Sequence, residues 1–209
     1  MPVWFAAGIG WLIASVLWWS GWRNELAEGV PGRWAGLYLA GWPFACAAAW
    51  MVPDGFSLNG SFGWTVMFAL ALFGLMDADQ RWMSLAAAMF IAAAVLFLFS
   101  LASMSKGEKF DAFSLAAVAA GIVAATMLGT AVEQLAAVFL GCLAASLAMS
   151  GLFGQTWFQH SDAAGSVGIH PWWLSVFAAR SLSLVLRFLS NRFGGRENPD
   201  GWDEGGEKV

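Results

Sequence analysis

The stretch AFSLAAVAAGIVAATMLGTAVEQLAAVFLGCLAASLAMSGLF, residues 112–153, decides the fold of this chain. Its 42 residues contain a single charged side chain, that of Glu133. As one helix the stretch would be about 63 Å long, whereas the hydrocarbon core of a bilayer is about 30 Å thick. The sequence therefore predicts two membrane-spanning helices, near 112–130 and 135–153, joined by a tight turn at Gly129–Gln134.

Small residues recur four positions apart in both of these predicted spans. The first contains Gly121 and Ala125, and the second contains Gly141 and Ala145. Small side chains on one face of a helix allow another helix backbone to approach closely in a membrane. We therefore expect these two spans to lie at the centre of a bundle.

The composition of the whole chain favours lipid as its solvent. Of the 209 residues 59% are hydrophobic and 11% are charged, whereas a soluble domain carries about 25% charged residues. So few charges cannot cover a water-facing surface around so much apolar side chain. The chain also lacks a basic patch with interleaved aromatic residues, so nucleic-acid binding has no support.

The hydropathy pattern predicts an all-α fold, a polytopic transmembrane helix bundle of about six spans over residues 1–153. Pro43 lies near the middle of the second span, where lipid tolerates a proline kink. The spans are expected near residues 3–22, 34–51, 62–76, 82–104, 112–130 and 135–153.

The C-terminal part of the chain is more polar. Residues 154–171 form a polar connection, and residues 172–193 return to apolar character but carry arginines on one side of a helical wheel. Arginine at the centre of a span costs about 2.5–3.5 kcal/mol. We therefore expect an amphipathic helix lying in the membrane interface with Arg180 and Arg187 toward anionic headgroups; a seventh span is the alternative. Residues 194–209 are predicted to be a disordered polar tail.

Basic residues near the ends of the spans predict the orientation of the bundle. With six spans, the side that holds both termini carries seven lysines and arginines. The other side carries three, namely Arg23, Arg33 and Arg81. This bias predicts that both termini lie in the cytoplasm.

Ionisable residues at membrane depth are the first candidates for a function. Glu133 could carry a proton or a cation, or it could mark the turn between two spans. Asp77 and Asp79 follow a short span and could equally belong to a solvated loop. Together with the two arginines of the C-terminal helix, the candidate functional polar residues are Glu133, Asp77, Asp79, Arg180 and Arg187.

The motifs of known chemistries are missing from the sequence. It contains no HExxH, GxSxG or phosphate-binding loop. His160 and His170 are ten residues apart and too few for a metal site, which needs three or four ligands. We therefore expect no catalytic residues, no cofactor and no metal.

The segment SGWRNELAEGVPGRWAGLYLAGW, residues 20–42, resembles the YphA-type family of small membrane proteins of spore-forming Gram-positive bacteria. The resemblance rests on the glycine–tryptophan–arginine run after the first span and on Gly41 and Trp42 within the second. It implies a multi-pass protein of the bacterial cytoplasmic membrane, connected with assembly of the spore envelope. It implies no site residues.

These observations favour a non-enzymatic scaffold or assembly factor of the cell or spore envelope. Its partners would be the lipid bilayer and other membrane proteins, and its oligomeric state is left open. The alternative is a small transporter or channel-like protein that uses Glu133 and a kink at Pro43. A membrane enzyme would require Asp77, Asp79 or the histidines to converge on one membrane face.

Overall fold

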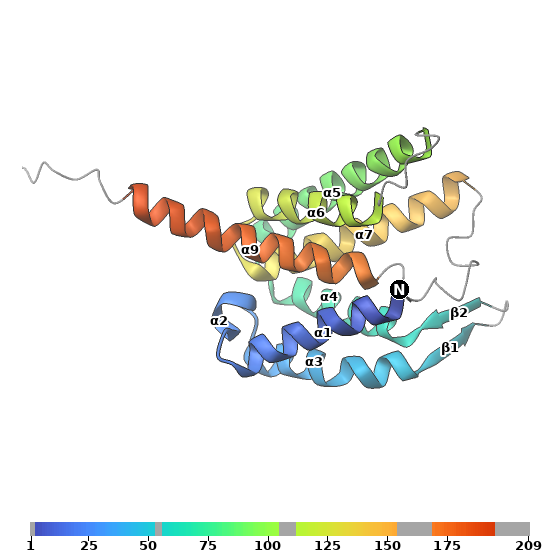
Figure 1. Ribbon diagram of the computed structural model, residues 1–209, viewed down its shortest axis with the longest axis horizontal. Helices are drawn as coiled ribbons and strands as arrows, with labels where there is room; N and C mark the ends of the chain where they lie inside the picture. The colour runs from blue at the N-terminus through green and yellow to red at the C-terminus, as the bar shows by residue number, and fades with distance from the viewer. Residues whose placement is uncertain (1–2, 53–55, 105–111, 154–168, 195–209) are drawn as a thin grey trace, which may run out of the picture.

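The computed structural model describes residues 3–52, 56–104, 112–153 and 169–194, and almost all of them are helical (Figure 1). The all-helical class is thus confirmed apart from one short hairpin. The helices are α1 (Val3–Trp19), α2 (Arg23–Leu26), α3 (Gly32–Ala47), α4 (Gly60–Leu75), α5 (Ala78–Met104), α6 (Ala112–Met127), α7 (Ala131–Phe153) and α9 (Ile169–Gly194). Most of the predicted connection 154–171 and tail 194–209 lies outside the described residues.

Each of the predicted spans corresponds to one long helix. By length and composition, two of the described helices could cross a membrane, over Ala78–Leu101 and Trp172–Arg192. Four other helices are apolar but shorter. Their apolar parts are Gly8–Trp19, Gly63–Leu75, Ser114–Met127 and Ala131–Ala145.

The hairpin corrects the predicted end of the second span. Helix α3 ends at Ala47, and the chain then forms two antiparallel strands, β1 (Ala49–Val52) and β2 (Phe56–Asn59). Val52 precedes a proline, which disfavours helical geometry at that residue. The backbone N–H of Gly60 donates to the carbonyl of Ala48 over 2.8 Å, so the hairpin joins directly onto the start of α4.

The long helices lie side by side along the long axis of the molecule (Figure 1). Helices α1, α4, α6 and α9 run toward the end of the molecule that carries α2. Helices α3, α5 and α7 run the opposite way, toward the end that carries the hairpin. We call these the α2 end and the hairpin end of the bundle.

The small residues of α6 and α7 allow close helix contacts, as the sequence predicts. A Cβ atom on Gly121 would lie 2.6 Å from the Cβ of Ala178 and 2.7 Å from the carbonyl oxygen of Ser175, both in α9. A Cβ atom on Gly141 would lie 2.6 Å from a side-chain carbon of Ile91 in α5. The close partners of α6 and α7 are therefore α9 and α5.

Candidate functional site: an arginine network at the α2 end

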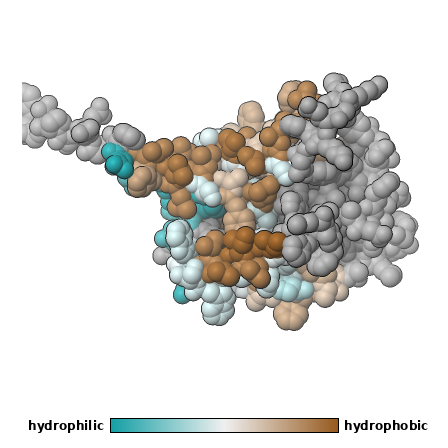
Figure 2. Space-filling model, in the orientation of Figure 1, coloured by the Kyte–Doolittle hydropathy of each residue, from teal (hydrophilic) through white to brown (hydrophobic). Residues whose placement is uncertain are grey.

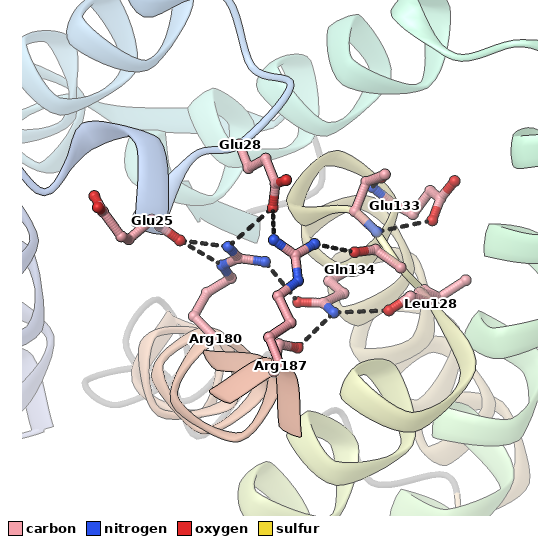
Figure 3. A network of polar contacts seen from close by, with 10 residues as sticks. Glu25, Glu28, Leu128, Glu133, Gln134, Arg180 and Arg187 are labelled. Carbon is pink, nitrogen blue, oxygen red and sulfur yellow. Dashed lines mark hydrogen bonds and ion pairs between the residues drawn. The ribbon is translucent and has the colours of Figure 1, made fainter. Parts of the chain in front are cut away.

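The side chain of Arg180 is buried, although arginine usually lies at the surface. It comes from the middle of α9, and 5% of the side chain is exposed. Its Nε donates to the backbone carbonyl of Glu25 over 3.0 Å, and Nη2 donates to the same carbonyl. Its Nη1 donates to Oε1 of Gln134 over 3.2 Å (Figure 3). Arg180 thereby joins α9 to α2 and α7.

Glu28 binds both arginines of α9. Arg187 lies seven residues after Arg180, which places both side chains on the same helical face. The Nη1 of Arg187 lies 2.5 Å from Oε2 of Glu28, and Nη2 of Arg180 lies 3.8 Å from the same oxygen. The other terminal nitrogen of Arg187 donates to the carbonyl of Gly129 over 2.8 Å. One carboxylate thus faces two guanidinium groups.

Gln134 is the centre of the network and is 1% exposed. Its amide nitrogen donates to the carbonyl of Leu128 over 2.9 Å and to the hydroxyl of Ser183 over 2.7 Å. Its amide oxygen accepts from Arg180. Both polar atoms therefore have partners, as a buried amide requires. The network ties the turn between α6 and α7 to α9.

A glycine turn brings Glu28 to the arginines. Gly29 has a φ of +80°, in the left-handed region that favours glycine. The N–H of Val30 donates to the carbonyl of Ala27 over 2.9 Å, which closes the turn. Val30 is buried beside Val132 of α7 in one small apolar cluster. The segment after α2 is thus held against α7, with Glu28 facing α9.

The predicted role of Arg180 at the membrane surface is wrong. We expected this arginine to face anionic headgroups, but its guanidinium bonds to protein groups. The start of α9 is also buried, because Trp172, Trp173 and Val176 pack inside the bundle. Helix α9 is therefore a member of the bundle over its first half and does not lie flat outside it.

Glu133 belongs to a capping box at the start of α7. Its carboxylate accepts the N–H of Thr130 over 3.2 Å, and its own N–H donates to the hydroxyl of Thr130 over 3.4 Å. This reciprocal pair satisfies two backbone groups at a helix N-terminus. Glu133 thus lies at the turn between α6 and α7, at the α2 end of the bundle.

Replacing Glu133 by alanine should destabilise the protein by about 1 kcal/mol, as loss of a helix cap does. The variant Glu133→Gln should keep most of the stability, because glutamine can accept the same backbone N–H. Thermal unfolding in detergent measures both. Equal loss in the two variants would show that the negative charge matters and that capping is not the role.

Asp77 and Asp79 lie apart from the arginine network. Both side chains are exposed at the start of α5. The neighbouring Arg81 donates to the carbonyls of Phe73 over 3.1 Å and Gly74 over 3.2 Å, and so caps the C-terminus of α4. Among the described residues, no hydrogen bond or ion pair connects these aspartates to Glu133. Asp77 and Asp79 therefore lie at the exposed connection between α4 and α5.

A small apolar cavity of about 60 Å³ lies beside the network, between α1 and α9. Residues of α3, α4 and α7 and of the segment after α2 complete its lining. Pro43 lies within α3 but does not line the cavity. The aromatic side chains around the cavity are Trp18, Tyr38, Phe68, Trp172 and Trp173. Over the described ranges, no three histidine, cysteine or acidic side chains are grouped as metal ligands would be.

Sequence reasoning missed Glu28, Gln134 and Ser183. Glu28 was overlooked because it lies in a polar loop, where a carboxylate is ordinary. The signal that could have found it is charge: arginines seven residues apart in an apolar helix need acceptors within the protein itself. In the sequence Gln134 stands out only as the end of the predicted turn at Gly129–Gln134.

Comparison with protein-family models, with curated proteins and with solved structures finds no match to this chain. The resemblance to the YphA-type family therefore stays an expectation. The geometry of the bundle, the arginine network and the exposed surfaces are therefore the features that indicate a function.

Proposed function

We propose that the chain is a polytopic membrane protein with seven spans, with the α2 end in the cytoplasm and the N-terminus outside. The alternating directions of the long helices support this topology (Figure 1). Helix α9 lies along α6 and runs parallel to it, so α9 serves as the seventh span. Its arginines are tolerated because protein groups bind them at the α2 end.

The distribution of basic residues supports the same orientation. Of the ten lysines and arginines, only Lys106 and Lys109 lie in the sequence between α5 and α6, which are connected at the hairpin end. The other eight belong to α2-end segments or follow α9 in the sequence: Arg23, Arg33, Arg81, Arg180, Arg187, Arg192, Arg196 and Lys208. Basic residues concentrate on the cytoplasmic side of bacterial membrane proteins.

Cysteine labelling tests this topology. In a variant with Cys46 and Cys142 replaced by alanine, a cysteine at the exposed position Ser20 should react with a membrane-impermeant maleimide only after the cells are opened. The C-terminus fused to a fluorescent protein should fluoresce, as in the cytoplasm. Labelling of the Ser20→Cys variant in intact cells would instead support six spans with both termini inside.

Within this topology, the chain acts as a non-enzymatic scaffold of the bacterial envelope. The observation that carries the proposal is the last part of α9, which extends beyond the α2 end of the other helices (Figure 1). Its apolar side chains are exposed: Val185, Leu186, Phe188 and Leu189 have 41–62% of their surface accessible. An exposed apolar helix face is suited to binding another protein when the preceding half of the helix is packed in the bundle.

The positions of the buried charged residues favour a scaffold function and not a transport function. Among the described residues, Glu133 and Arg180 are the buried charged side chains, and both are engaged by protein groups at the α2 end. A transporter would need polar groups that can exchange a substrate near the membrane midplane. The capping box gives Glu133 a structural role.

A photo-crosslinking experiment tests the scaffold. A photoreactive amino acid at Leu189 should crosslink one defined partner in living cells. The variant Phe188→Ala should abolish that product. The matched control Phe97→Ala changes a phenylalanine of similar exposure, 66% against 62%, on α5, and should leave the product intact. Crosslinks to lipid alone, or equal yields in both variants, would contradict the proposal.

A further inference from the structure

We infer that the cavity between α1 and α9 holds part of one hydrocarbon chain of an anionic phospholipid. This inference rests on the proposed membrane placement and names a ligand for the bundle. The cavity is partly open to the surface. Figure 2 shows this face of the molecule, with apolar side chains on α1 and on α9 at the two borders. In a membrane this face meets lipid.

The arrangement of α1 and α9 explains why the cavity exists. At one point the two helices touch, because a Cβ atom on Gly10 would lie 2.8 Å from the Cβ of Trp173. Further toward the α2 end, Ala14 and Trp18 of α1 and Val176 of α9 border open space. The link from Arg180 to the carbonyl of Glu25 holds α9 to α2 beyond that space. The cavity therefore results from the two contacts that hold α9 on either side of it.

The size of the cavity fits a chain segment. A space of about 60 Å³ holds about four water-sized groups, far below the 300–1,000 Å³ of a pocket for a complete small molecule. Its lining is almost wholly apolar and aromatic, which excludes a stable cluster of water. A methylene chain that enters from the bilayer satisfies both conditions.

The charge around the mouth of the cavity points to an amphiphile with an anionic head. The cations at the α2 end lie on the side where a headgroup would be. Arg23 lies over the ring of Trp18, which lines the cavity. Arg187 is 46% exposed and shares its carboxylate partner with Arg180.

Native mass spectrometry of the detergent-purified full chain tests the inference, with phosphatidylglycerol and phosphatidylcholine as competing probes. The expected result is one retained phospholipid for each chain, with phosphatidylglycerol preferred. The variant Ala14→Phe fills the cavity and should reduce retention about tenfold, as expected when about two methylene groups lose their burial. The matched control Val16→Phe lies on the same helix but is 58% exposed, and should retain the lipid.

A second variant keeps the inference testable if Ala14→Phe fails to fold. Arg187→Gln changes an exposed side chain and should keep the bound phospholipid but lose the preference for phosphatidylglycerol. Unchanged retention in Ala14→Phe, or a wild-type chain without lipid, would overturn the inference. These outcomes do not test the scaffold proposal, because the crosslink at Leu189 does not depend on lipid retained in the cavity. Removal of the chain from membranes by carbonate would instead refute the membrane placement itself.

Discussion

Replacing Gly121 by alanine should lower the midpoint of thermal unfolding by about 5–10 °C, the result of overpacking by one methyl group between two helices. The added Cβ atom would lie 2.7 Å from the carbonyl oxygen of Ser175 and 2.9 Å from the backbone nitrogen of Ala179. Backbone atoms cannot move aside as a flexible side chain can. Helix α9 must therefore shift away from α6 along its whole contact.

Gly36→Ala is the matched control for that experiment. Gly36 is also inside a helix, but a Cβ atom there would meet nothing within 4 Å. Its unfolding midpoint should stay within about 2 °C of the wild type, because a methyl group in open space costs little. If both variants unfold at the same temperature, the close contact of α6 with α9 does not exist in the folded protein.

Replacing Arg180 by methionine should destabilise the protein by about 3 kcal/mol, the typical cost of removing one partner from a buried charged network. The change leaves Oε1 of Gln134 and the carbonyl of Glu25 without their donor. The ion pair with Glu28 contributes little of this loss, since Glu28 is 42% exposed and the closest distance is 3.8 Å. Urea or thermal unfolding in detergent measures the effect.

Two comparisons make that result specific. Arg192→Met changes an exposed arginine on the same helix and should alter stability by less than about 0.5 kcal/mol. The double variant Arg180→Met with Gln134→Leu should recover part of the loss, because replacing both members of a buried polar pair by apolar groups can be nearly neutral. A double variant less stable than Arg180→Met alone would show that Gln134 contributes independently of the arginine.

Hydropathy predicted the positions of the long helices well, because each long apolar run of the sequence forms one helix. The turn between α6 and α7 was expected at Gly129–Gln134, and the helix break lies at Leu128–Thr130. The hairpin after Ala47 was missed, because Ala49–Val52 continues the apolar run of α3. Apolar character alone does not distinguish a helix end from a strand.

The site was less predictable because its parts are far apart in the sequence. The pattern Thr130-x-x-Glu133 is a capping box that can be identified from sequence. In contrast, Arg180 and Glu25 are separated by 155 positions and Arg180 and Gln134 by 46. No periodicity within α9 indicates which loop supplies its acceptors. Only the tertiary packing makes a buried arginine stable.

The long sequence separation in the arginine network has a consequence for biogenesis. The ribosome makes α9 after every helix that provides its acceptors. Until α9 has been made, Gln134 lacks its hydrogen-bond donor Arg180, and the cavity beside α1 lacks the wall that α9 provides. A chain truncated before Ile169 would therefore present an incomplete bundle to cellular proteases.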